Sequence, residues 1–143
     1  MTDDWAAQRR EAAAANAERA ERARAADVAA ARELVAAFVR DARERGIATR
    51  ELLVRAGEGP STYRCGLVGW YLRRDGSLAI ADDGEMYVLT APKSLRAMIS
   101  GVKLEPTEPR TQAGIGARDG ESIALDSLLA LRLAAGDDWP IVR

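Results

Sequence analysis

The fold of this chain is decided by residues 61–90, which read STYRCGLVGWYLRRDGSLAIADDGEMYVLT. Two tripeptides, Arg74-Asp75-Gly76 and Asp82-Asp83-Gly84, separate three apolar runs in this stretch. Each tripeptide suits a three-residue hairpin loop, in which a type I turn is followed by glycine in the left-handed region. The stretch therefore predicts a three-stranded antiparallel meander.

The length of the two loops also predicts the register of the strands. Three-residue loops place Leu72 opposite Leu78 and Ile80 opposite Met86, whereas a two-residue loop would mix the two faces. One face is then apolar and comprises Val68, Trp70, Leu72, Leu78, Ile80, Met86 and Val88. The other is mostly polar and comprises Tyr71, Arg73, Ser77, Ala79, Glu85 and Tyr87. The apolar face needs a helix or a second sheet packed against it.

The segment before the meander predicts one long helix over residues 3–45, because Ala, Arg and Glu are strong helix formers. Gly46 is placed to end it. At about 1.5 Å per residue the helix would be about 60 Å long, which is longer than the domain it serves. Between residues 6 and 27 its only apolar side chains are alanines. From residue 28 onward larger side chains recur at heptad spacing, namely Val28, Ala31, Val35, Phe38 and Ala42.

We therefore predict an α+β fold with three parts. Residues 1–46 form the long helix, with 1–27 projecting or frayed. Residues 47–136 form an antiparallel β-rich domain of five or six strands, and residues 137–143 form a tail that is loose unless Trp139 docks. Further strands are expected at 51–56 and 101–105, with another short one at 111–115, and residues 121–125 are expected to be extended. A short amphipathic piece is expected at 93–99, and a helix at 127–135 with Asp126 as its N-cap and Gly136 at its end.

Composition excludes several classes of protein. The 21 basic and 22 acidic residues balance, which is unlike a generic nucleic-acid binder. The single cysteine, Cys65, cannot form an intramolecular disulfide. No apolar run reaches 18 residues, and no hydrophobic signal region follows the acidic MTDDW start. We expect a cytoplasmic protein that does not enter a membrane.

Three segments, GWYLRRDGSLAI (69–80), MYVLTAP (86–92) and RDGESI (118–123), resemble those of a set of small uncharacterised actinobacterial proteins. The similarity covers roughly residues 61–133 and extends more loosely to the helix before them. The resemblance supports the domain boundary and implies an actinobacterial host. It implies no activity, cofactor, partner or functional residue.

No set of residues predicts an active site. The chain has no histidine, which excludes Ser-His-Asp and Cys-His sites and most zinc sites. Asp82, Asp83 and Glu85 could hold Mg²⁺ or Ca²⁺, although Asp-Gly is also what the turn itself requires. The glycine loop 114–120 could bind phosphate, but it lacks the Lys-Ser/Thr of a P-loop. Cys65 beside Arg64 could be a reactive thiol, or a half-buried inert one. We expect no catalytic residue, no cofactor and no metal.

Four side chains are candidates for binding a partner on the exposed sheet face: Arg64, Tyr71, Arg73 and Tyr87. Aromatic and arginine side chains on a sheet stack RNA bases in several domains, and they are also enriched at protein interfaces. The opposing interpretation is that the N-terminal helix covers this face, so that the tyrosines belong to the core.

The preferred functional hypothesis is a non-catalytic protein-interaction or self-association module that acts through the N-terminal helix. The alternative is a nucleic-acid or ribosome-associated protein that uses the exposed sheet face with Arg64, Arg73 and Arg74. A third hypothesis is a metal-dependent enzyme with its site at Asp82 and Asp83.

Overall fold

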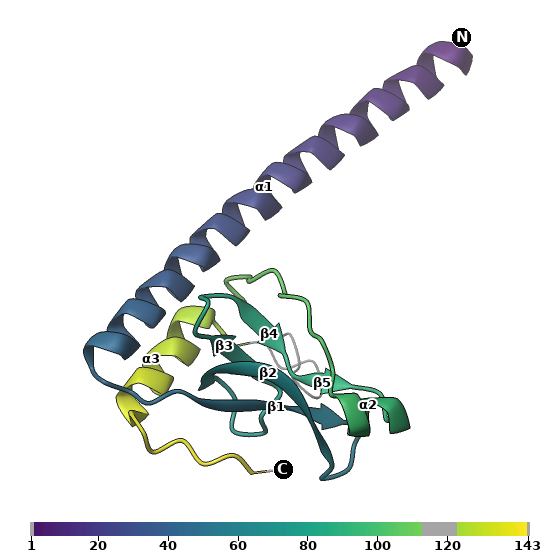
Figure 1. The fold of residues 1–143 in the computed structure, drawn as a ribbon. Helices are drawn as coiled ribbons and strands as arrows, with labels where there is room; N and C mark the ends of the chain where they lie inside the picture. Colours follow the sequence, from purple (N-terminus) through teal and green to yellow (C-terminus); the bar gives the residue numbers. More distant parts are fainter. Residues whose placement is uncertain (1, 113–122, 143) are drawn as a thin grey trace.

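The computed structural model describes residues 2–112 and 123–142, and it confirms the α+β class (Figure 1). A long N-terminal helix is followed by a five-stranded sheet and a C-terminal helix. The elements in chain order are α1 (Thr2–Glu44), β1 (Arg50–Ala56), β2 (Thr62–Tyr71), β3 (Leu78–Ala81), β4 (Met86–Val88), β5 (Thr90–Ala91), α2 (Leu95–Ser100) and α3 (Leu125–Ala135). None of the helices in these described ranges is both long and apolar enough to cross a membrane.

The meander has the predicted register. Ile80 pairs with Met86, and the backbone N–H of Leu72 donates to the Leu78 carbonyl at 2.8 Å. Gly76 and Gly84 have φ values of 75° and 85°, as glycines that end three-residue hairpin loops should. The alternation of side chains along these strands therefore predicted the pairing and most of the faces, but the assignment of Val68 to the buried apolar face is wrong, because Val68 is 39% exposed.

The sheet is mixed, so the prediction of a purely antiparallel sheet is wrong for one pair of strands. The strand order is β4-β3-β2-β1-β5, and β5 runs parallel to β1. Only Leu89 lies between the two edge strands, β4 and β5. Its N–H donates to the Ser77 carbonyl, and its own carbonyl accepts from the Arg55 N–H, both at 2.8 Å. Because one residue links opposite edges, the sheet must curl until its two edges meet.

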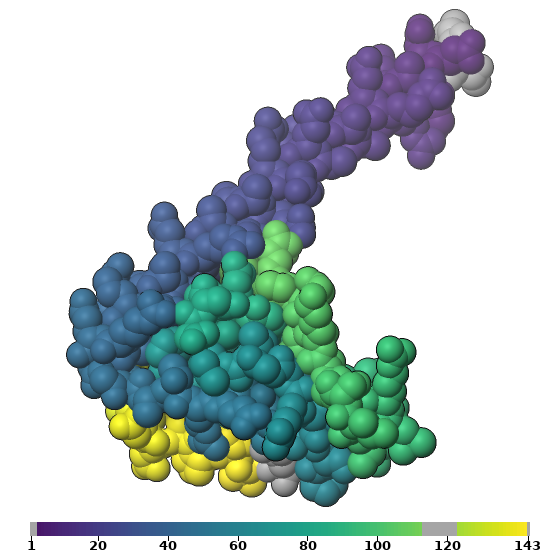
Figure 2. All heavy atoms as spheres, viewed as in Figure 1, coloured from purple at the N-terminus to yellow at the C-terminus, as the bar shows by residue number. Residues whose placement is uncertain are grey.

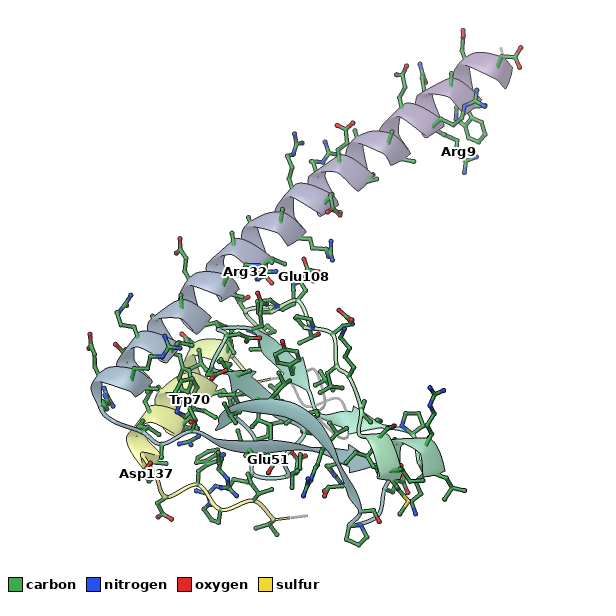
Figure 3. The ribbon with its side chains drawn as sticks, viewed as in Figure 1. Arg9, Arg32, Glu51, Trp70, Glu108 and Asp137 are labelled. Atoms are coloured by element: carbon green, nitrogen blue, oxygen red, sulfur yellow. The ribbon has the colours of Figure 1, made fainter. Side chains whose placement is uncertain are left out.

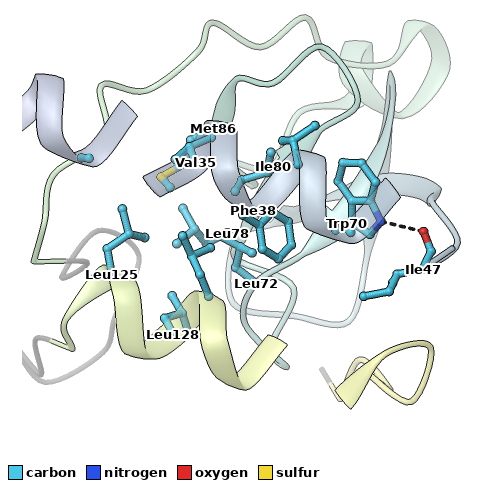
Figure 4. Packing of buried hydrophobic residues seen from close by; sticks show 14 residues of the cluster. Val35, Phe38, Ile47, Trp70, Leu72, Leu78, Ile80, Met86, Leu125 and Leu128 are labelled. Atoms are coloured by element: carbon cyan, nitrogen blue, oxygen red, sulfur yellow. Dashed lines mark hydrogen bonds between the residues drawn. The ribbon is translucent and has the colours of Figure 1, made fainter. Parts of the chain in front are cut away.

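The convex face of the curled sheet packs against α1 and α3 and forms what we call the outer core (Figure 4). The Phe38 and Trp70 rings meet edge to face, with centroids 5.9 Å apart. The indole N–H of Trp70 donates to the Ile47 carbonyl at 3.0 Å, just beyond the end of α1. The other buried members are Ala31, Val35, Val39, Ala42, Leu72, Leu78, Ile80, Met86, Leu125, Leu128 and Leu129.

The opposite face lies inside the curl and forms a second cluster, the inner core. It comprises Leu52, Val54, Ala56, Tyr63, Tyr71, Ala79, Ala81, Tyr87, Leu89 and Trp139. The expectation that this face is exposed is wrong: Tyr71 is 2% exposed and Tyr87 is 5% exposed. The opposing interpretation was right that the tyrosines are core, but α1 covers the other face. Here the sheet encloses its own inner face, and the C-terminal tail covers it with Trp139.

α1 is one uninterrupted rod of 43 residues, and only its second half packs on the domain (Figures 1 and 2). Burial starts at Val28, which is 8% exposed. One turn earlier, Arg24 forms an ion pair with Glu108, and the Asp27 carboxylate accepts from the Arg110 Nε at 2.6 Å. These contacts attach the rod where it leaves the domain. We call residues 2–27 the arm.

Several predicted elements differ in the structure. Residues 101–105 form no strand. Of the segments predicted at 111–115 and 121–125, residues 113–115 and 121–122 lie outside the described residues, and the described parts are joined by an isolated bridge from Gln112 to Ala124. α3 begins at Leu125 with Ala124 as its N-cap, so Asp126 lies in the first turn. The Asp126 carboxylate accepts instead from the adjacent Ser127 N–H at 2.7 Å. Gly136 does end the helix, as predicted.

Candidate interaction surface

The four predicted partner-binding side chains do not share an exposed face. Arg64 is exposed on β2, whereas Tyr71 and Tyr87 are inner-core residues and Arg73 is half-buried. The Tyr71 hydroxyl accepts from the Leu53 N–H at 2.7 Å. Both tyrosine rings therefore serve the core, and neither offers a face on which a nucleic-acid base could stack.

Tyr87 is also tied into the turn that precedes its strand. Its hydroxyl donates to the Asp83 carboxylate at 2.8 Å. Burial, together with this hydrogen bond, raises the pKa of Tyr87 to about 12. The hydroxyl therefore stays protonated at neutral pH, and it acts as a structural donor.

The carboxylates proposed for a cation are occupied by the turn. The second oxygen of Asp83 accepts from the Glu85 N–H at 2.8 Å, and Glu85 pairs with Arg32 of α1 at 3.7 Å. Asp82 is exposed, and its backbone carbonyl accepts from Arg43 at 2.6 Å. Within residues 2–112 and 123–142, no three Asp, Glu or Cys side chains gather as a metal site would require.

The other two candidates for chemistry gain no support. The glycine loop at 114–120 lies outside the described residues. Cys65 is half-buried, with its sulfur 3.2 Å from the Leu52 carbonyl. Burial raises the pKa of its thiol, which disfavours the reactive thiolate.

A different feature, the short helix α2, stands out from the surface (Figure 2). Hydrogen bonds fix both of its ends. At the first end, Ser94 is the N-cap: its side chain accepts from the Ala97 N–H at 3.3 Å, and its own N–H donates to the Tyr63 hydroxyl at 2.6 Å. At the last end, Val102 N–H donates to the Arg64 carbonyl at 2.8 Å. α2 is thereby attached to β2 at both ends.

Although α2 is fixed, none of its residues is buried. Leu95, Met98 and Ile99 are 82%, 67% and 91% exposed, and we call these three residues the α2 ridge. Only Ala97 packs, partly buried, on the inner core. Burying a Leu, Ile or Met side chain is favourable by about 1.5–3 kcal/mol. The fold therefore holds three large apolar side chains in water, where they contribute little to its stability.

A hollow flanks the α2 ridge on each side. The larger, about 720 Å³, lies between α2 and β2 and is lined in part by Arg64, Cys65 and Ile99. The smaller, about 260 Å³, is lined in part by Lys93 and Leu95. Tyr63 and Met98 line both hollows. An apolar ridge between two hollows is a shape that a bulky apolar side chain of a partner can fit.

The segment that carries the α2 ridge is basic. Residues 92–104 contain Lys93, Arg96 and Lys103 and no acidic residue, and all three basic side chains are exposed. Arg64 adds a fourth exposed cation beside the larger hollow. In a chain whose total charge is balanced, this is a local excess that favours an acidic partner.

Comparison with known protein families, with curated proteins and with solved structures finds no match to this chain. The resemblance to actinobacterial proteins therefore stays a prediction. The function has to be argued from the surface itself.

Sequence reasoning missed this surface for a specific reason. The spacing of Leu95, Met98 and Ile99 is i, i+3, i+4, which is typical of a buried helix face. The length of the segment was the signal that indicated exposure. A helix bounded by Pro92 and Gly101 is too short to extend across either core.

Proposed function

We propose that this protein is a non-catalytic interaction module, and that it binds its partner through the α2 ridge and the arm. The observation that carries the proposal is that hydrogen bonds at both ends of α2 hold three exposed apolar side chains in place. An apolar patch rimmed by polar and charged groups is typical of a protein-binding surface.

The arm supports the same proposal. Residues 2–22 of α1 have no described contact with the rest of the chain, and their described side chains are exposed or at most half-buried. A segment of helix that does not pack on the domain is available to bind a partner. The half-buried and solitary Cys65 suits a reducing compartment, so we further propose that the module acts in the cytoplasm.

The test is affinity purification from the lysate of the native host, with and without nuclease, using three tagged chains. These are the full chain, a chain that begins at Asp27, and a full-length Leu95→Ser/Ile99→Ser variant. We expect an identified protein to be recovered with the full chain after nuclease treatment and to be lost with at least one of the altered chains.

Equal recovery with all three chains would contradict the proposal. If recovery collapses on nuclease treatment for every chain, the protein binds nucleic acid instead. That result would favour the alternative function, although burial of Tyr71 and Tyr87 removes the aromatic faces on which it was based.

A further inference from the structure

The far end of the arm carries an apolar side chain that the fold does not use. Trp5 is 61% exposed, whereas Trp70 and Trp139 are 1% and 8% exposed. The Arg9 guanidinium lies 4.4 Å from the centroid of the Trp5 ring (Figure 3). Tryptophan is among the residues most enriched at the energetic centres of protein interfaces. Trp5 is therefore a side chain suited to a protein interface that the described part of its own chain does not bury.

The first turn of α1 carries a charge opposite to that of the segment with the α2 ridge, and the basic residues Arg9 and Arg10 begin one turn later. Asp3 and Asp4 lie in the first turn of α1, directly before Trp5, and residues 2–8 contain no basic side chain. The α2 ridge is surrounded by the four cations described above. The tip thus presents an aromatic ring that directly follows two carboxylates and has Arg9 against its face, and the other surface presents aliphatic side chains and hollows with cations around them.

We infer that the tip of the arm, residues 3–5, binds the α2 ridge of a second copy of this chain. The inference rests on the proposed function and names the partner. The indole of Trp5 enters the larger hollow beside Met98 and Ile99. Asp3 and Asp4 pair with basic side chains around the ridge, among which Lys93 and Lys103 are the chain's two lysines.

The contact has to form between copies. α1 is a single rod that carries its first residue away from the domain, so the tip does not reach the α2 ridge of its own chain (Figure 1). From Thr2 to Asp27 the arm is about 39 Å long at 1.5 Å per residue. The contact joins two different surfaces, so two copies can exchange arms reciprocally, or further copies can add in a row. A single contact of this kind is smaller than a standard interface of about 1,200–2,000 Å². We therefore expect reversible, concentration-dependent association.

The decisive experiment is sedimentation velocity of three full-length proteins over a hundredfold range of concentration. The proteins are the unaltered chain, Trp5→Ala and Ile99→Asp. Both changes are at exposed positions, and circular dichroism verifies that both variants fold. We expect the unaltered chain to associate. For each variant alone, the dissociation constant should be at least about tenfold higher, which is the effect of losing one central interface residue.

Mixing the two variants tests the pairing itself. The Trp5→Ala copy keeps an intact α2 ridge, and the Ile99→Asp copy keeps an intact tip, so the mixture should form a heterodimer at concentrations at which neither variant alone associates. Leu131→Asp is the matched control, because Leu131 is 57% exposed on α3 and belongs to neither surface. It should associate like the unaltered chain. Added salt should weaken association, since the paired charges are exposed.

Three results would overturn the inference. The first is that the unaltered chain stays monomeric at every concentration. In that case, a host protein whose recovery requires the α2 ridge would still support the proposed function. The second is association that Ile99→Asp abolishes and Trp5→Ala leaves unchanged, which would indicate contact between two ridges. The third is a monomer that binds phosphatidylserine vesicles through Ile99 and independently of Trp5, which would indicate a membrane surface.

Discussion

Replacing Trp139 with alanine should detach the C-terminal tail from the inner core. The Trp139 ring is 8% exposed and belongs to that core. It lies between two guanidinium groups, with Arg74 at 4.8 Å and Arg132 at 5.2 Å from the ring centroid. Its backbone carbonyl accepts from Arg50 at 3.2 Å. These contacts hold the tail over the end of the curled sheet.

The magnitude follows from the area that Trp139 buries. A buried tryptophan removes about 150–250 Å² from water, which at about 25 cal/mol per Å² is an upper limit of about 4–6 kcal/mol. Two effects reduce the loss. The freed tail regains conformational entropy, and the substitution removes an indole N–H that is buried without a hydrogen-bond partner among the described residues. We expect the free energy of unfolding to fall by about 2–3 kcal/mol, in the lower range of Trp→Ala losses.

The assay is thermal unfolding followed by circular dichroism. For a domain of this size a loss of 2–3 kcal/mol lowers Tm by about 8–12 °C. Trp139→Phe is the control: it keeps an aromatic ring and removes the unpartnered N–H, so its Tm should stay much closer to that of the unaltered protein. If Trp139→Ala unfolds within about 2 °C of the unaltered protein, the tail does not stabilise the inner core and the reasoning fails.

Three further predictions concern positions where the structure gives a direct physical reason. Gly69→Ala should lower the free energy of unfolding in urea by about 2 kcal/mol or more, because its Cβ would lie 2.2 Å from the Ile80 carbonyl oxygen. Gly66→Ala places its Cβ in open space at a φ of +75°, so it should lower the free energy of unfolding by about 1 kcal/mol. Equal losses for Gly69→Ala and Gly66→Ala would contradict the steric explanation. The folded-state pKa of Tyr87, about 12, lies above the ordinary value of 10.0, so its contribution is complete below pH 10 and is lost as the pH rises towards 12. Urea titrations across this pH range should show that Tyr87→Phe loses less free energy of unfolding with rising pH than the unaltered protein does. Identical pH profiles for the two proteins would exclude the effect. Deleting residues 2–22 should leave Tm within about 2 °C, since these residues have no described contact with the domain; a larger fall would mean that the arm does pack on it.

The hairpins were predictable because everything that determines them is local. The Asp-Gly loops and the alternation of side chains lie within one short stretch, and each supports the same register. Trp70 and Leu72 were assigned to the correct face for this reason. The same local signals predicted α1, whose composition favours a helix whatever surrounds it.

The burial of the other sheet face was not predictable from the same signals. Tyr71, Ser77 and Tyr87 are typical of a half-exposed surface, and their polar atoms suggest water as a partner. The structure satisfies them within the protein instead: Tyr71 accepts from a β1 N–H, and Tyr87 donates to Asp83. Both hydrogen bonds join neighbouring segments, whereas burial of the face depends on β5, which crosses to the far edge through Leu89 and pairs with β1, a strand distant in sequence.

The candidate surface was missed for the reverse reason. The sequence of α2 predicts an apolar face. The same pattern does not indicate whether another part of the protein covers that face. Whether Ile99 is buried or exposed depends on where Ser94 and Val102 attach the helix. Ser94 attaches it to Tyr63 of β2, and Val102 attaches it to Arg64 of the same strand. The attachment leaves α2 without a second layer above it from any described part of the chain.

The length of α1 has to be explained separately from the stability of the domain. Its packed half, from Val28 to Ala42, supplies everything that the outer core takes from the helix. The arm adds about 39 Å to the rod without burying a large side chain, and its alanine-rich composition keeps it helical in water. A flexible tail could carry Trp5 as easily, but it would lose conformational entropy on binding. A preformed rod loses much less, and it holds the tip at a set distance from the domain. The arm is thus suited to bridging a fixed gap between two copies.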